Sequence, residues 1–128
     1  METRTHNPTD GIYAPVGEYV HALEVRNPRR LLFVAGTMGL DPSGTPGANI
    51  TEQLQLIWSN IRIILASASM TLDNIVRVTS YLRDVAYVGD NSAARVEALG
   101  GRFVPTTAIV AQTLVSEWLV EIEVLAAE

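Results

Sequence analysis

The sequence predicts a single α+β domain over residues 1–128, with a mixed β-sheet of about six strands and two helices on one face. Strand-like and helix-like patterns alternate along the chain, with strands at both ends and between the helices. No repeat, low-complexity tract or linker divides the chain, and 128 residues suit one hydrophobic core. This order favours a sandwich in which both helices cover the same sheet face.

The first third of the chain predicts an extended lead-in and two or three strands. Residues 1–15 contain Asn7-Pro8 and Ala14-Pro15 and are expected to be extended, and residues 18–25 form the first predicted strand. Residues 31–35 are apolar throughout, so this second strand is expected to be buried on both faces. Residues 36–40 fit a short bent strand, and the Pro- and Gly-rich residues 41–47 a loop.

The middle of the chain predicts both helices and the strand between them. Asn49 precedes Glu52 by three residues, which is the spacing of a capping box at a helix start. Apolar residues then recur at steps of three or four, which indicates a helix with one apolar face; they are Leu54, Trp58, Ile61, Leu65 and Ala68. Residues 75–82 are rich in β-branched side chains and predict a strand, and residues 87–99 a second helix ended by Gly100-Gly101.

The last quarter of the chain predicts a closing hairpin that carries two carboxylates. Its two β-rich runs, residues 105–110 and 118–124, flank a short polar turn. Because strand side chains alternate, Glu121 and Glu123 face opposite to the valines and isoleucine around them. A carboxylate on a buried or cleft-facing strand needs a hydrogen-bond partner or changes its pKa. This strand is therefore the first place to look for chemistry, although a purely structural glutamate fits the pattern too.

Composition limits the classes of function. Residues are 48% apolar and only 18% charged, which favours burial of apolar surface against further copies of the chain. The net charge of −5 argues against a nucleic-acid partner. The chain has no cysteine, no apolar signal sequence and no run long enough to span a membrane, so we expect a cytoplasmic protein. His6 and His21 lie outside any metal-ligand spacing, and we expect neither metal nor cofactor.

Three short segments of the chain have the form of known motifs: Pro105-Thr106-Thr107-Ala108, Val120-Glu121-Ile122-Glu123 and Gly17-Glu18-Tyr19. They resemble the Pro-x-Arg-Ser, Val-Glu-Ile-Glu and Gly-Pro-Tyr segments of the Rid (RidA/YjgF-like) family. Rid proteins are homotrimers with a chorismate-mutase-like fold, and the best-known members hydrolyse imines and enamines to release ammonia. The resemblance implies a homotrimer with a small-molecule ligand in clefts between subunits.

The resemblance also implies roles for single residues. Glu121 matches the glutamate thought to orient a water or assist proton transfer, while Glu123 is expected to be structural. Tyr19 matches a tyrosine of the cleft wall, and Gly36 would let backbone approach the ligand closely. Ile109 stands where some members have a cysteine, which excludes a thiol-based switch, and together with Thr107 and Ala35 it implies a pocket more apolar than usual. We therefore take Glu121 as the candidate catalytic residue and Tyr19, Gly36 and Ile109 as candidate ligand contacts.

Thr107 stands where the family has its arginine. A guanidinium grips a carboxylate with two charge-assisted bonds of about 1.5–3 kcal/mol each, whereas a threonine offers one neutral donor. Binding of 2-imino or 2-enamino acids should then be weaker by about a hundredfold or more. Either the substrate lacks a carboxylate, or nothing is hydrolysed, or another arginine replaces the missing one; the candidates are Arg77, Arg102 and Arg62.

Three functions follow from these observations. The first is hydrolysis, or a related reaction, of an imine, an enamine or a similar reactive intermediate, with an altered substrate. The alternative is a non-catalytic, ligand-binding or regulatory trimer that keeps the cleft. RNA cleavage, attributed to some relatives, is the least favoured because the chain is acidic.

Overall fold

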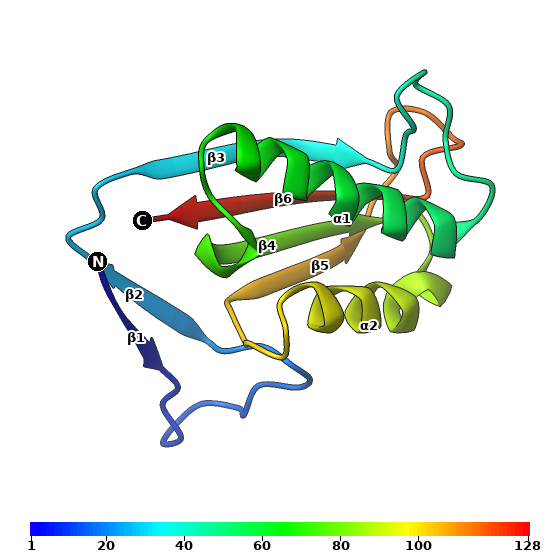
Figure 1. Ribbon diagram of the computed structural model, residues 1–128. Helices are drawn as coiled ribbons and strands as arrows, with labels where there is room; N and C mark the ends of the chain where they lie inside the picture. The colour runs from blue at the N-terminus through cyan, green and yellow to red at the C-terminus, as the bar shows by residue number, and fades with distance from the viewer.

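The computed structural model describes all 128 residues and contains six strands and two α-helices, which confirms the predicted α+β class (Figure 1). Two short 3-10 turns precede β4 and α2. In chain order the elements are β1 (Glu2–His6), β2 (Ala22–Arg26), β3 (Leu31–Met38), α1 (Ile50–Ser67), η1 (Leu72–Asn74), β4 (Ile75–Leu82), η2 (Val85–Tyr87), α2 (Val88–Ala98), β5 (Thr106–Val110) and β6 (Val120–Ala127).

The main sheet has four strands in the order β3-β6-β4-β5 and is mixed, as expected. Strand β6 runs antiparallel to β3 and β4, whereas β5 runs parallel to β4. The predicted closing hairpin is therefore wrong, because β4 lies between β5 and β6. The helix α2 connects β4 to β5 as a crossover, which makes these strands parallel, and residues 111–119 then carry the chain across to the other side of β4.

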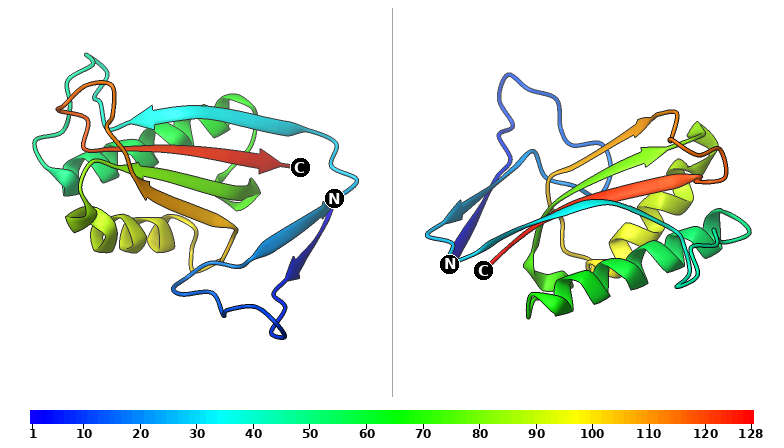
Figure 2. Two further views of the ribbon diagram at one scale, coloured as in Figure 1. Left: turned by 180° about the vertical axis from the view of Figure 1, so that it is seen from behind. Right: turned by 90° about the horizontal axis from the view of Figure 1, so that it is seen from above.

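The remaining two strands form a separate hairpin, the β1–β2 arm, which projects beside the main sheet (Figures 1 and 2). The six expected strands are thus divided between two sheets. The predicted first strand, residues 18–25, begins later than expected, at Ala22, and the lead-in contains β1. All five residues of β1 are polar and exposed. Its sequence therefore lacks the alternation of apolar and polar residues by which a strand is recognised.

Both helices cover one face of the main sheet, and the hydrophobic core lies between the two layers (Figure 2). From α1 the core receives Leu54, Ile57, Trp58, Ile61 and Leu65. From β6 it receives Val120, Ile122, Val124 and Ala126. Each large side chain buried in this way stabilises the fold by about 1.5–3 kcal/mol. Neither helix is both long and apolar enough to cross a bilayer.

The N-terminus of α1 is capped close to the predicted way. The Asn49 side chain accepts a hydrogen bond from the Glu52 amide at 2.9 Å. The Glu52 carboxylate accepts from the Ala48 amide at 2.8 Å, one residue before the donor that a capping box uses. These two bonds fix the residue at which the helix begins.

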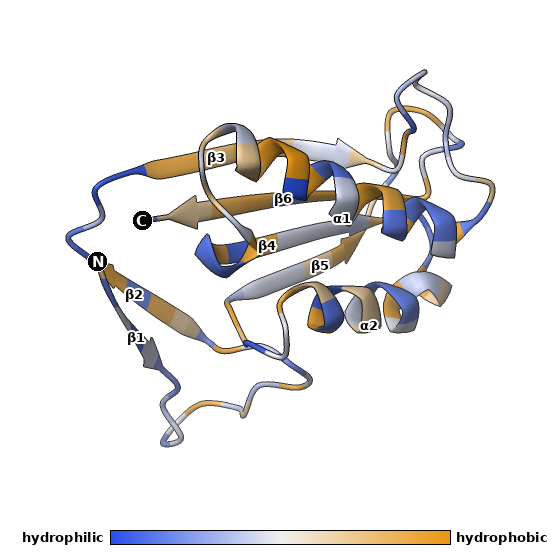
Figure 3. Cartoon of the chain, viewed as in Figure 1, coloured by the Kyte–Doolittle hydropathy of each residue, from blue (hydrophilic) through white to orange (hydrophobic).

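The other face of the main sheet has no layer over it. We call this surface the open face: the side chains of β3, β4, β5 and β6 that point away from the helices. Strand β3 was predicted to be buried on both sides, and this is wrong, since Phe33 is 77% and Leu31 51% exposed. Val34, which points to the core, is only 7% exposed. The first half of β3 is hydrophobic (Figure 3), yet one chain supplies no partner for its outer side.

Candidate functional site

Acidic, hydroxyl-bearing and apolar side chains lie on the open face. They form rows that run across the sheet from one strand to its neighbour. Strand pairing places Glu121 beside Tyr81, and Tyr81 beside Ile109. Partner residues on paired strands point to the same side of a sheet, and residues two apart along a strand share a face. Because Ile122 and Val120 point into the core, this row lies on the open face.

A second row lies one step along the same strands. Glu123 pairs with Thr79, and Thr79 pairs with Thr107. Thr107 is therefore in the row of Glu123 and not in that of Glu121. Two strand spacings separate Thr107 from Glu123, or roughly 10 Å. The face thus brings the two predicted residues, Glu121 and Thr107, onto one surface with Tyr81 and Thr79 between their strands.

Glu123 and Tyr81 form the closest polar contact of this surface. The Tyr81 hydroxyl donates to Oε1 of Glu123 at 2.6 Å, and both side chains are half-buried. This hydrogen bond, with some help from burial, raises the pKa of the Tyr81 hydroxyl above its ordinary value. The negative charge of Glu121 adds to the rise, while the positive charge of Arg77 opposes it. Tyr81 therefore keeps its proton and holds the Glu123 carboxylate in place.

Glu121 has no such partner. No hydrogen bond or ion pair joins its half-buried carboxylate to another residue of the chain. Gly36 on β3 leaves room for this carboxylate, because a Cβ atom at Gly36 would lie only 2.7 Å from Oε1 of Glu121. Gly36 was expected to let backbone approach a ligand. In the structure it lets backbone approach the Glu121 carboxylate, whose oxygens stay free to accept hydrogen bonds.

The two predicted contacts on β5 are accessible. Thr107 is exposed, and Ile109 is 48% exposed at the end of the row that holds Glu121. Strand β5 is the outer strand of the main sheet, so nothing from the same sheet covers these residues on the far side. They can contact a ligand or another molecule that lies on the open face.

Tyr19 lies apart from these rows, in the segment between β1 and β2. Its hydroxyl accepts a hydrogen bond from the Val16 amide at 3.3 Å, and its ring meets that of His21 edge to face. The neighbouring residue Glu18 is fixed to α2, since the Arg95 guanidinium donates to its carbonyl oxygen. Arg95 is only 5% exposed, and burial lowers the pKa of its guanidinium. The chain thus positions Tyr19 on the arm, not on its own open face.

Of the three arginines named as possible replacements, one lies on the open face. Arg77 is exposed on β4 and belongs to the same strand face as Thr79 and Tyr81. Arg102 donates to the carbonyl oxygens of residues 72 and 75, which is a structural role. Arg62 lies on α1, on the opposite side of the sheet. A guanidinium for a ligand on the open face is therefore available only from Arg77 among these three.

Sequence reasoning missed Tyr81 and Thr79. Alternation within residues 75–82 places Arg77, Thr79 and Tyr81 on one strand face and Val78 on the other, so a signal was present. What the sequence lacks is the pairing of β4 with β6, which brings Tyr81 to the two glutamates. The structure contains no group of three or more His, Cys, Asp or Glu side chains able to hold a metal ion.

A mixed sheet with both helices on one face, and Glu121 and Glu123 of β6 on the other face, defines a small α+β protein. Residues 11–128 match the family described as Endoribonuclease L-PSP. A RutC family protein of Pyrococcus horikoshii is 28% identical over 120 residues, covering 92% of this chain and 93% of the relative. A second one, from Pyrococcus abyssi, is 31% identical over 114 residues, covering 88% and 87%.

Solved structures agree with these sequence matches. A Rid family protein from Yersinia pestis, YyfB, superimposes with a TM-score of 0.81 at 25% identity and covers 100% of both chains. RidA from an Antarctic Psychrobacter superimposes with a TM-score of 0.73 at 25% identity, covering 98% of this chain and 100% of that one. The chain belongs to the Endoribonuclease L-PSP family, that is, to the Rid or YjgF-like proteins.

Proposed function

We propose that this protein binds or acts on a small reactive metabolite of the imine or enamine type, on the open face of its main sheet. The observation that carries the proposal is the Glu121 carboxylate, which has no protein partner and shares its face with the Tyr81–Glu123 pair and Thr107. Relatives named RutC family protein and RidA support a role in small-molecule chemistry.

The proposal includes assembly of three copies through their open faces. Phe33 and Leu31 expose apolar surface on the same face as Glu121. Covering one such side chain stabilises an association by about 1.5–3 kcal/mol. Clefts between subunits would then enclose Glu121, and the β1–β2 arm, which is not paired with the main sheet, would carry Tyr19 to the wall of a cleft.

Within such a cleft, Glu121 would act on water. Its free carboxylate accepts a hydrogen bond from a water molecule and directs the water oxygen to the carbon of a C=N bond. As the C–O bond forms, the C=N π electrons move to nitrogen, and the water proton reaches nitrogen by way of Glu121. A second proton transfer from the new hydroxyl group to nitrogen lets ammonia leave and a carbonyl form. Thr107 offers a neutral hydroxyl to the substrate, and Arg77 is the candidate anchor for a carboxylate.

A second candidate is a trimer that binds such a metabolite without turning it over. The neutral Thr107, at the position of the family arginine, favours this function because it removes the strongest contact to a substrate carboxylate. RNA cleavage is the least favoured function. The open face carries Glu121 and Glu123 against a single arginine, Arg77, and the chain has a net charge of −5.

The test uses 2-aminoacrylate generated in solution and follows its loss. We expect the wild-type rate to be near background and Thr107→Arg to raise it at least tenfold, because the guanidinium restores two charge-assisted bonds. Glu121→Gln in the Thr107→Arg background should abolish the gain, while the control Glu117→Gln, in an exposed loop, should not.

Binding is tested separately by a thermal-shift screen of small carbonyl and amine metabolites. A ligand that stabilises the wild type and not Glu121→Gln, with no turnover, would favour the binding protein over the enzyme. If Thr107→Arg gains no activity and no metabolite shifts the unfolding temperature, the proposed use of the open face is wrong.

A further inference from the structure

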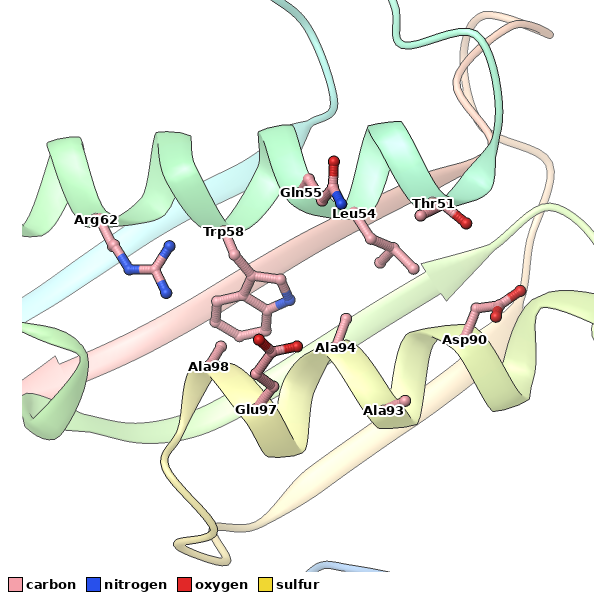
Figure 4. A pocket seen from close by; sticks show the side chains of 10 residues that line it. All are labelled: Thr51, Leu54, Gln55, Trp58, Arg62, Asp90, Ala93, Ala94, Glu97 and Ala98. Atoms are coloured by element: carbon pink, nitrogen blue, oxygen red, sulfur yellow. The ribbon is translucent and has the colours of Figure 1, made fainter.

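A concave site lies between the two helices (Figure 4), which cover the face of the main sheet opposite to the open face. The groove has a volume of about 360 Å³, at the lower end of the range for small-molecule sites. Ala93, Ala94 and Ala98 of α2 face Trp58 and Leu54 of α1, so small side chains on one wall leave the space open.

Trp58 supplies a buried donor without an acceptor. The residue is only 4% exposed, and its indole Nε1 has no hydrogen-bond partner. Buried N–H groups are normally paired, because leaving one unpaired costs its lost hydration. In Figure 4 the ring edge that carries Nε1 points between Leu54 and Ala94, both of which line the groove. Nε1 itself has almost no exposed surface, so an oxygen atom of a ligand would provide the missing acceptor once Leu54 and Ala94 part slightly at this edge.

Charged groups of both signs flank the indole ring. Arg62 of α1 lies to one side of it and Glu97 of α2 beside it, while Asp90 lies further along α2 (Figure 4). None of the three belongs to any of the four ion pairs of the structure. The groove therefore offers an unused cation, unused carboxylates and an unpaired donor around an apolar floor.

We propose that this groove binds a small zwitterion of the amino-acid type with an apolar side chain. The ligand carboxylate accepts from Nε1 of Trp58, the ammonium group pairs with Glu97, and the apolar side chain lies against Leu54 and Ala94. The positive charge of Arg62 offsets the carboxylates of α2. The groove therefore favours a zwitterion over a simple amine. The groove belongs to the helix layer, so this site does not depend on the function proposed for the open face.

The two tryptophans make the site directly observable, because each gives one indole N–H signal in a proton–nitrogen NMR spectrum. Trp118→Phe removes one signal and thereby assigns that of Trp58. On titration with L-leucine we expect the Trp58 indole proton to move downfield and to saturate, while the Trp118 signal stays in place. The comparison ligands are 4-methylpentanoate, which lacks the ammonium group, and 3-methylbutylamine, which lacks the carboxylate; each should bind at least tenfold more weakly.

Two variants test the assigned contacts. Glu97→Gln should weaken L-leucine binding about tenfold, whereas Glu117→Gln, an exposed glutamate outside the groove, should leave it unchanged. The proposal is overturned if L-leucine gives no saturable Trp58 shift at millimolar concentration. It is equally overturned if Glu97→Gln binds L-leucine as tightly as the wild type does.

Discussion

Replacing Gln53 by alanine should destabilise the protein more than any exposed change on the same helix. Gln53 lies in the first turn of α1 and is only 2% exposed. Its Nε2 donates to the carbonyl oxygens of Gly47 at 3.0 Å and Glu117 at 2.8 Å, and its Oε1 accepts from the Leu119 amide at 2.9 Å. One side chain thus joins the helix to the loop that leads into β6, the strand of Glu121.

The size of the expected destabilisation by Gln53→Ala follows from these three hydrogen bonds. Each such bond contributes a net 0.5–1.5 kcal/mol, so their loss should cost about 3 kcal/mol. Backbone groups left unpaired in a buried position raise this cost, and water that enters the space lowers it. For a chain of this size, about 3 kcal/mol corresponds to a fall of roughly 10 °C in the unfolding midpoint.

The assay is urea unfolding at one fixed protein concentration, because self-association would change the apparent stability. The matched control is Gln55→Ala, two residues further along α1, where the side chain is exposed. This change should alter the free energy of unfolding by less than about 0.5 kcal/mol. If the two variants differ by less than about 1 kcal/mol, the three hydrogen bonds do not hold the loop as argued.

Three further predictions concern the open face. Under the proposed assembly through the open face, Phe33→Glu should shift the sedimentation of the protein toward that of a single chain, since it puts a charge on apolar surface; unchanged sedimentation would exclude this face as the interface. Glu123→Gln should lower the pKa of Tyr81 in an ultraviolet titration. In the wild type the hydrogen bond to Glu123 raises the pKa of Tyr81 above the ordinary tyrosine value. The pair therefore stabilises the fold below about pH 10, and this contribution is lost as the pH rises through the raised pKa. Identical titrations of the variant and the wild type would contradict the assignment. Gly36→Ala should weaken the ligand-induced thermal shift while changing the unfolding midpoint of the free protein by only a few degrees, because the new Cβ meets the flexible end of Glu121; equal ligand shifts would show that the carboxylate position is unimportant.

The elements with strong local signals were predicted well. Helix α1 shows its apolar period and its Asn49 cap in the sequence, and β4 has the predicted bounds. Alternation along β6 was enough to place Glu121 and Glu123 opposite the core. These predictions succeeded because each depends on residues close together in the chain.

Pairing between distant strands was not predictable in the same way. The period of a strand tells which face a side chain takes, but not which strand lies beside it. The β5 and β6 runs therefore resembled a hairpin, and the contact of Tyr81 with Glu123 was missed. The apolar run of β3 had a second ambiguity, because burial inside one chain and burial against another copy leave the same pattern.

The two outer strands of the main sheet limit how the molecule can polymerise. An unpaired strand border is a template for adding further strands and so for fibre growth. Here β5 has only five residues and directly follows Pro105, while β3 is interrupted by a register shift between Val34 and Thr37. Short or irregular borders resist lateral extension. Lengthening of the sheet into a ribbon, by strands added from another copy at either border, is therefore disfavoured.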